Sequence, residues 1–225
     1  MIQRLVWYLE LTSGEPEQLE TMVSFAASQG ASLHTVFIEN DVLLRCGELP
    51  CSREISQLTG RARPLRSEQL ARQLHQRREQ LEQRLAMLAA RHTLNWSWKL
   101  ARGRRERMLG TAGSDEVAVL MLSAGEPLPA WLAGLQRSLL LLLGSRFRPF
   151  SRIVVLLDDG NDTELLALGQ ALAERSKLPF QVQRHVPLRS DLVLARADNP
   201  VLTKAGSTAI NAVLLLPAQS CADGT

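Results

Sequence analysis

Apolar residues in this chain alternate between short continuous runs and stretches with helical spacing. Leu5–Leu9 is a continuous run of strand length, and apolar residues then recur at three- and four-residue steps over Glu17–Ser28. Gly30 stands where a residue in the left-handed conformation would end that helix. β-Branched and aromatic residues fill Ser32–Ile38, as in a strand. The chain therefore begins with a strand, a helix and a strand, an order that predicts a right-handed parallel crossover.

The next segment combines an irregular stretch with a long helix. Asp41–Gly60 is interrupted by Gly47 and Pro50, which predicts a loop with one or two short helical turns. Ser67 is expected to be the N-cap of a helix that extends to about His92. Leucines mark one face of this helix, namely Leu70, Leu74, Leu81, Leu85 and Leu88.

Alternation at Asn95–Leu100 then predicts a strand with Trp96 and Trp98 on one face, packed against a helix. The rest of this part of the chain is predicted as a helix at Arg104–Ala112, a buried strand at Glu116–Leu122, a short helix near Ala130 and a last strand at Leu139–Leu143.

After the connector Arg146–Phe150 the same order begins again, which indicates an internal repeat. The counterpart of the long middle helix is missing from this second copy. The pattern predicts an α/β protein with two Rossmann-like lobes, each a mostly parallel sheet with flanking helices: a complete lobe at residues 1–147 and a shortened one at 148–225. The strands of the second lobe are expected at Arg152–Asp158, Phe180–Val186, Asp191–Ala195 and Ala212–Leu216, and its helix at Thr163–Arg175. A lobe of about 75 residues seldom has a self-sufficient core, so we expect the second lobe to need the first.

Composition narrows the class of protein. Of the 225 residues, 45% are apolar and 22% are charged, proportions typical of a globular protein and unlike those of a disordered chain. The longest apolar run, Leu139–Leu143, is far shorter than the ~18 residues of a membrane span. Three cysteines without framework spacing and a start without a secretory signal pattern predict a cytoplasmic protein with reduced thiols.

The order of elements and two local sequences together resemble the universal stress protein family. Leu33-His-Thr-Val-Phe-Ile-Glu-Asn40 is similar to the second strand of such a domain, and Arg152-Ile-Val-Val-Leu-Leu-Asp-Asp-Gly160 to its opening strand. The resemblance covers nearly the whole chain, as a tandem form whose second lobe is degenerate and truncated. It implies a parallel five-stranded sheet in a complete lobe, and two final strands that meet across the lobe interface as in a family dimer.

Many members of that family bind ATP through an acidic residue after the first strand and a glycine-rich loop that opens a helix. The resemblance implies Asp158, Gly206 and Ser207 as the cofactor-binding candidates here. The loops Ser123–Pro129 and Arg196–Pro200 depart from the family pattern, because the first has one glycine and the second has none. The sequence therefore favours a protein without the family's ATP site. A nucleotide-binding switch that uses Asp158 and the lobe interface is the alternative.

Candidate catalytic and metal-binding groups do not form a recognisable set. The four histidines show no His-x-x-x-His or His-Cys pairing, His34 is expected as a strand residue with local hydrogen bonds, and no Gly-x-Ser-x-Gly motif is present. Asp158, Asp159 and Asp162 can be read as a magnesium cluster, or as a strand end followed by a helix cap that Asp162 supplies. We favour the cap, and we expect neither a metal site nor enzymatic activity.

Charge is concentrated in one region. Arg53–Arg107 contains 14 Lys and Arg against 5 Asp and Glu, whereas the remainder of the chain has 12 against 18. A solvated helix face is our first interpretation of this region, a surface for an unknown protein partner the second, and nucleic acid the third. The whole sequence predicts a noncatalytic, stress-related or regulatory protein that acts by binding a partner, with a homodimer as a further expectation.

Overall fold

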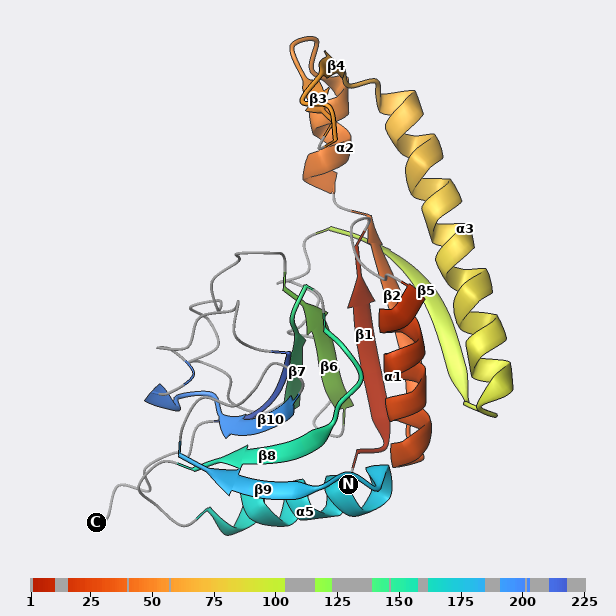
Figure 1. Ribbon diagram of the computed structural model, residues 1–225. Helices are drawn as coiled ribbons and strands as arrows, with labels where there is room; N and C mark the ends of the chain where they lie inside the picture. The colour runs from red at the N-terminus through yellow and green to blue at the C-terminus, as the bar shows by residue number, and fades with distance from the viewer. Residues whose placement is uncertain are drawn as a thin grey trace, which may run out of the picture.

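The computed structural model describes most of the chain and places its strands in one large sheet and a separate two-stranded hairpin (Figure 1). The described residues are 2–10, 16–39, 41–56, 58–103, 116–122, 139–145, 147–157, 162–184, 191–200, 202 and 211–217. The predicted helices at Arg104–Ala112 and near Ala130 lie outside these ranges.

Nine strands form the sheet, in the order β5-β2-β1-β6-β7-β11-β10-β8-β9. β7 and β11 pair antiparallel, and every other neighbouring pair is parallel. The sheet therefore consists of two parallel runs, and the predicted meeting of the two final strands is confirmed. The first run contains β1 (Arg4–Leu9), β2 (Ser32–Glu39), β5 (Trp96–Arg102), β6 (Glu116–Met121) and β7 (Leu139–Leu143). The second contains β8 (Arg152–Leu156), β9 (Phe180–Gln183), β10 (Asp191–Arg196) and β11 (Ala212–Leu216).

The two runs can be aligned through equivalent ion pairs at the amino ends of their strands. Arg4 of β1 is in register with Glu116 of β6, and their side chains are 2.7 Å apart. Arg152 of β8 is in register with Asp191 of β10, also at 2.7 Å. β8, β9, β10 and β11 thus retrace β1, β2, β6 and β7, and β5 has no equivalent among the described strands.

Helices α1 (Pro16–Gln29), α3 (Ser67–Arg91) and α5 (Thr163–Ser176) bury their apolar faces in the same core cluster on one face of the sheet. The leucine stripe predicted for the long helix is buried in that cluster. Trp96 and Trp98 pack against it as predicted, and the ring of Trp98 stacks on Phe37 with centroids 6.0 Å apart.

Helix ends agree with the sequence in two places and differ in a third. Gly30 ends α1 with φ +63°, and Asp162 caps α5 by accepting a hydrogen bond from the Leu165 amide at 3.0 Å. Ser67 is not an N-cap, since it is the first residue of α3 and Arg66 occupies the cap position without a side-chain cap bond. Arg66 has the extended backbone of an N-cap, with φ −105° and ψ 125°. The helix therefore begins one residue earlier than predicted.

The one or two short helical turns predicted within Asp41–Gly60 are confirmed, but the rest of the segment is not simply a loop. Helix α2 (Asp41–Glu48) is followed by a hairpin of β3 (Arg53–Ile55) and β4 (Ala62–Pro64). Gly47 does not interrupt the structure: a Cβ at this position would lie 3.1 Å from Ser67 Cα, so glycine permits close approach of α2 to the start of α3. Figure 1 shows α2 and the hairpin projecting beyond the carboxyl ends of β1 and β2, next to the beginning of α3.

The two runs also contact each other through their helices. Gln29 at the end of α1 donates a hydrogen bond to Ser176 Oγ at the end of α5, at 2.7 Å. Phe25 and Phe150 meet edge to face with centroids 5.3 Å apart. A domain boundary at residues 147 and 148 stays a prediction, since the strands on either side belong to one continuous sheet.

Candidate functional site

Ligands of open parallel sheets usually bind at the carboxyl ends of the strands, where the strand order reverses. In this sheet the reversals fall between β1 and β6 in the first run and between β8 and β10 in the second. These two places are the first candidates for a functional site.

Arg196, the last residue of β10, organises this edge in the second run. Its Nε is 2.6 Å from Asp162 Oδ2, and its Nη2 is 3.0 Å from Asp162 Oδ1 and 2.6 Å from Glu164 Oε2. Its Nη1 donates to the carbonyl of Pro217, just after β11, at 3.0 Å. Buried Asn199 adds a bond of 3.4 Å from Nδ2 to the Leu156 carbonyl at the end of β8. The strand ends are therefore tied to the first turn of α5.

Electrostatics stabilise this closed arrangement. The hydrogen bonds from Arg196 hold the pKa of the Asp162 carboxyl below its usual value, and the cap bond from the Leu165 amide acts in the same direction. The bonds from Asp162, and then those from Glu164, raise the pKa of Arg196. One guanidinium is thus shared by two carboxylates, so this cluster has a net negative charge.

The cluster of Asp162, Glu164 and Arg196 is unfavourable for binding a nucleotide phosphate. A helix N-terminus attracts anions through its unpaired N–H groups and positive potential. At α5 the Asp162 carboxylate already accepts a hydrogen bond from one of these groups, and the cation that could bind phosphate is held by acidic side chains. The sequence pattern does not single out Arg196 as a site residue. An arginine directly after a buried apolar strand was the available signal.

The described part of the first run's edge contains another ion pair. Glu39 at the end of β2 is 8% exposed, and its Oε2 lies 3.1 Å from Nε of Arg102 at the end of β5. Glu10 follows β1 directly and is half-buried. The loop Ser123–Pro129 lies outside the described residues.

The predicted cofactor-binding residues Asp158, Gly206 and Ser207 also lie outside the described residues, so they stay predictions. His34 is a strand residue with local partners, as predicted: its Nδ1 is 2.6 Å from Ser97 Oγ, and burial lowers its pKa. Cys46 and Cys51 are free thiols. Within the described ranges no cluster of three His, Cys, Asp or Glu side chains is arranged to hold a metal ion.

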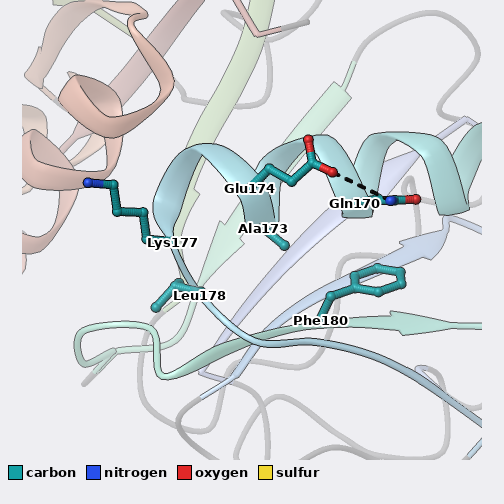
Figure 2. A pocket seen from close by; sticks show the side chains of 6 residues that line it. All are labelled: Gln170, Ala173, Glu174, Lys177, Leu178 and Phe180. Atoms are coloured by element: carbon teal, nitrogen blue, oxygen red, sulfur yellow. Dashed lines mark hydrogen bonds between the residues drawn. The ribbon is translucent and has the colours of Figure 1, made fainter.

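A shallow groove of about 530 Å³ lies between α5 and the edge strand β9 (Figure 2). Its apolar part is formed by Ala173, Leu178 and Phe180. Glu174 and Lys177 stand on the helix side, and Gln170 Nε2 donates to Glu174 Oε1 at 3.4 Å.

The projection seen in Figure 1 has an excess of arginine over acidic residues. We call residues 41–78 the basic arm; it comprises α2, the hairpin and the first half of α3. It contains eight arginines and no lysine, against three glutamates and one aspartate. Three apolar side chains are exposed on it: Leu49 by 54%, Ile55 by 68% and Leu58 by 97%.

Comparison with known proteins bears on the fold. The structure is similar to that of a universal stress protein from Archaeoglobus fulgidus DSM 4304, with TM-score 0.54, 9% sequence identity, and coverage of 94% of this chain and 98% of that one. A second solved structure, assigned to universal stress proteins of Pseudomonas aeruginosa UCBPP-PA14, has TM-score 0.48 and 12% identity, covering 96% of this chain and 93% of the other. No family model and no curated protein matches the sequence.

The predicted resemblance is thereby confirmed for the fold, which is that of universal stress proteins. Of the described helices, none combines the length and apolar character required to cross a membrane.

Proposed function

We propose that this protein is a noncatalytic, stress-related or regulatory protein that acts by binding an acidic protein partner through the basic arm. The basic arm itself is the observation that carries this proposal: a projection beyond the sheet that combines arginine with exposed aliphatic side chains.

The arginines are suited to bind carboxylates. The guanidinium group presents a planar set of donors that pairs with a carboxylate through two hydrogen bonds. In the hairpin, Glu54 pairs with Arg63 across the strands. Arg53, Arg61 and Arg72 are exposed and have no ion-pair partner within the described part of the chain. They leave positive charge on the same arm as its apolar tip, by which we mean Ile55 and Leu58 of the hairpin.

The exposed leucines and isoleucine favour a protein over a nucleic acid. Single-stranded nucleic acids are commonly bound by stacking bases on aromatic rings, and the arm contains no Phe, Trp or Tyr. Burial of an aliphatic side chain in an interface contributes about 1.5 to 3 kcal/mol. Three such residues flanked by arginine match a segment with both apolar and acidic side chains.

Two substitutions at the tip test the proposal. Ile55→Glu with Leu58→Glu should reduce recovery of the partner from cell extracts, and its direct binding after purification, by more than about tenfold, since apolar contact is lost and acidic residues repel. Met87→Glu is the matched control, because Met87 is 55% exposed on α3 but lies outside the arm. Both proteins should melt at the same temperature, since the changed residues are exposed.

Three results would count against the proposal. Equal partner binding by the tip variant and the control would remove the arm as the binding surface. A gel shift with nucleic acid that weakens steeply with salt would assign the arm to nucleic acid instead. Calorimetric binding of magnesium ATP tighter than about 100 μM would favour the nucleotide switch over a partner-binding protein.

A further inference from the structure

The open edge of β9 is a second surface, separate from the basic arm. The alignment through the ion pairs Arg4–Glu116 and Arg152–Asp191 makes β9 the equivalent of β2. In the first run the outer edge of β2 is covered by β5, which pairs with it in parallel over seven residues. On the outer side of β9 the described part of the chain places no strand.

Backbone hydrogen bonds show which groups of β9 face outward. The carbonyls of Pro179 and Gln183 accept bonds from β8, from the amides of Ile153 and Leu157 at 2.9 and 3.1 Å. Because residues in a strand alternate, the backbone groups of Phe180 and Val182 point to the open edge.

The first run shows how these outward groups are used when a strand is present. Leu33 is equivalent to Phe180, and its amide donates to the carbonyl of Asn95 at the start of β5, at 2.9 Å. The next outward position is equivalent too: Thr35 of β2 corresponds to Val182 of β9. Thr35, which lies in register with Trp98 of β5, is 1% exposed, whereas Val182 is 47% exposed.

The side chains of β9 do not discourage pairing with another strand. Exposed edge strands commonly carry charged residues that prevent association, and the edge strand β5 carries Lys99 and Arg102. β9 reads Phe-Gln-Val-Gln, without charge. Its cations flank it, with Lys177 before the strand and Arg184 after it, both exposed.

We propose that β9 and the groove beside α5 form a strand-addition site for an extended segment of a partner protein. The segment pairs with the backbone of Phe180 and Val182 and places alternate apolar side chains over the groove. Acidic residues at its two ends match Lys177 and Arg184 in charge. Strand β5, which occupies this place beside β2, shows the expected alternation of apolar side chains, since Trp96 and Trp98 lie in register with Leu33 and Thr35.

A peptide copied from β5 is the probe. Asn-Trp-Ser-Trp-Lys-Leu, residues 95–100, is compared with an analogue that carries Asn95→Asp and Lys99→Glu, both with blocked ends. Calorimetry with the whole protein should show the acidic analogue binding about fivefold more tightly than the original peptide. In amide exchange, its binding should protect the N–H groups of Phe180 and Val182.

Val182→Pro is the decisive variant. It removes an N–H that faces outward and leaves the bonds to β8 intact, so the fold should persist. Affinity for the analogue should fall about tenfold or more. Val182→Thr keeps the N–H and should bind within about threefold of the original. Leu58→Glu in the basic arm should leave peptide binding unchanged, which separates this site from the arm.

Three outcomes would overturn the proposal. The first is that neither peptide binds at roughly 1 mM, and the second is equal binding by the Val182→Pro and Val182→Thr proteins. The third is light scattering that shows a dimer of the free protein which Val182→Pro converts to a monomer, because the edge would then belong to a second copy of this chain.

Discussion

The two parallel runs share a plan but differ in how each buries its strands. The first run has five strands and adds α3, whose leucines cover the sheet beside α1. The second has four strands, and of the described helices α5 alone belongs to it. In β2 the face under the helices is buried, whereas β9 leaves Val182 about half exposed. The shorter run therefore has less apolar contact of its own. It is stabilised by contacts with the first run, namely the pairing of β11 with β7, the hydrogen bond between α1 and α5, and the contact of Phe150 with Phe25.

The described part of the second run therefore keeps the strand order of the first without a counterpart of β5, while its innermost strand pairs with the first run. The antiparallel pairing of β7 with β11 gives the second run a continuous hydrogen-bonded neighbour. Within the described residues, no strand pairs with the outer side of β9.

Separation of the runs should have the largest effect. Residues 150–225 alone should show no cooperative thermal transition by circular dichroism, because β11 loses its pairing with β7 and α5 loses α1. Residues 1–147 measured in parallel provide the comparison. A sharp independent transition of the shorter fragment would show that its core suffices without the first run.

A substitution that disturbs the close packing of α5 on its strands should have the next largest effect on stability. A Cβ at Gly169 would lie 2.4 Å from Val155 Cγ2 and 2.9 Å from Phe180 Cε2. Gly169→Ala should lower the free energy of unfolding by about 2 kcal/mol, as measured by urea denaturation. Gln170→Ala, on the exposed side of the same helix, should change it by less than about 0.5 kcal/mol. Equal effects of the two would mean that α5 can move away from the sheet at little cost.

Acid should weaken the ion pair between Asp162 and Arg196 at the carboxyl ends of the second run's strands. The folded pKa of Asp162 is depressed, so its stabilising contribution is present above its unfolded pKa of about 4 and is lost as the pH falls through the folded value. Asp162→Asn can still cap α5 but loses the charge, and should lower stability by about 1 kcal/mol at pH 7. The difference from the wild type should shrink below about pH 4. A difference that is constant with pH would exclude the ion pair as its cause.

An exchange of equivalent residues should have the smallest effect. The hydroxyl of Thr35 is buried and has no hydrogen-bond partner within the described structure. Thr35→Val should leave stability unchanged or raise it by up to about 1 kcal/mol, because an unsatisfied polar group is removed. The reverse change, Val182→Thr, should stay within about 0.5 kcal/mol on the exposed edge. A marked loss in the first variant would show that the hydroxyl has a bonded partner, such as a buried water.

Local signals in the sequence predicted much of the fold. Apolar runs and helical spacing located α1, β2, α3 and the strands of both runs, and Gly30 and Asp162 marked helix ends that the structure confirms. The predicted strand at Phe180–Val186 is described only as Phe180–Gln183. The hairpin was missed because β3 and β4 have three residues each, too few for a periodic pattern.

The amino-acid sequence by itself determined the order of the described strands and helices and predicted that this order begins again, because these patterns follow from contacts between residues close in the chain. Only the tertiary structure decided the role of Arg196, whose partners Asp162 and Pro217 lie 34 and 21 residues away. It also decided that, among the described strands, β9 lies at an edge of the sheet while its equivalent β2 is covered by β5. Pairing between distant segments leaves no periodic mark in the sequence, so neither the Arg196 cluster nor this edge could be derived from the sequence alone.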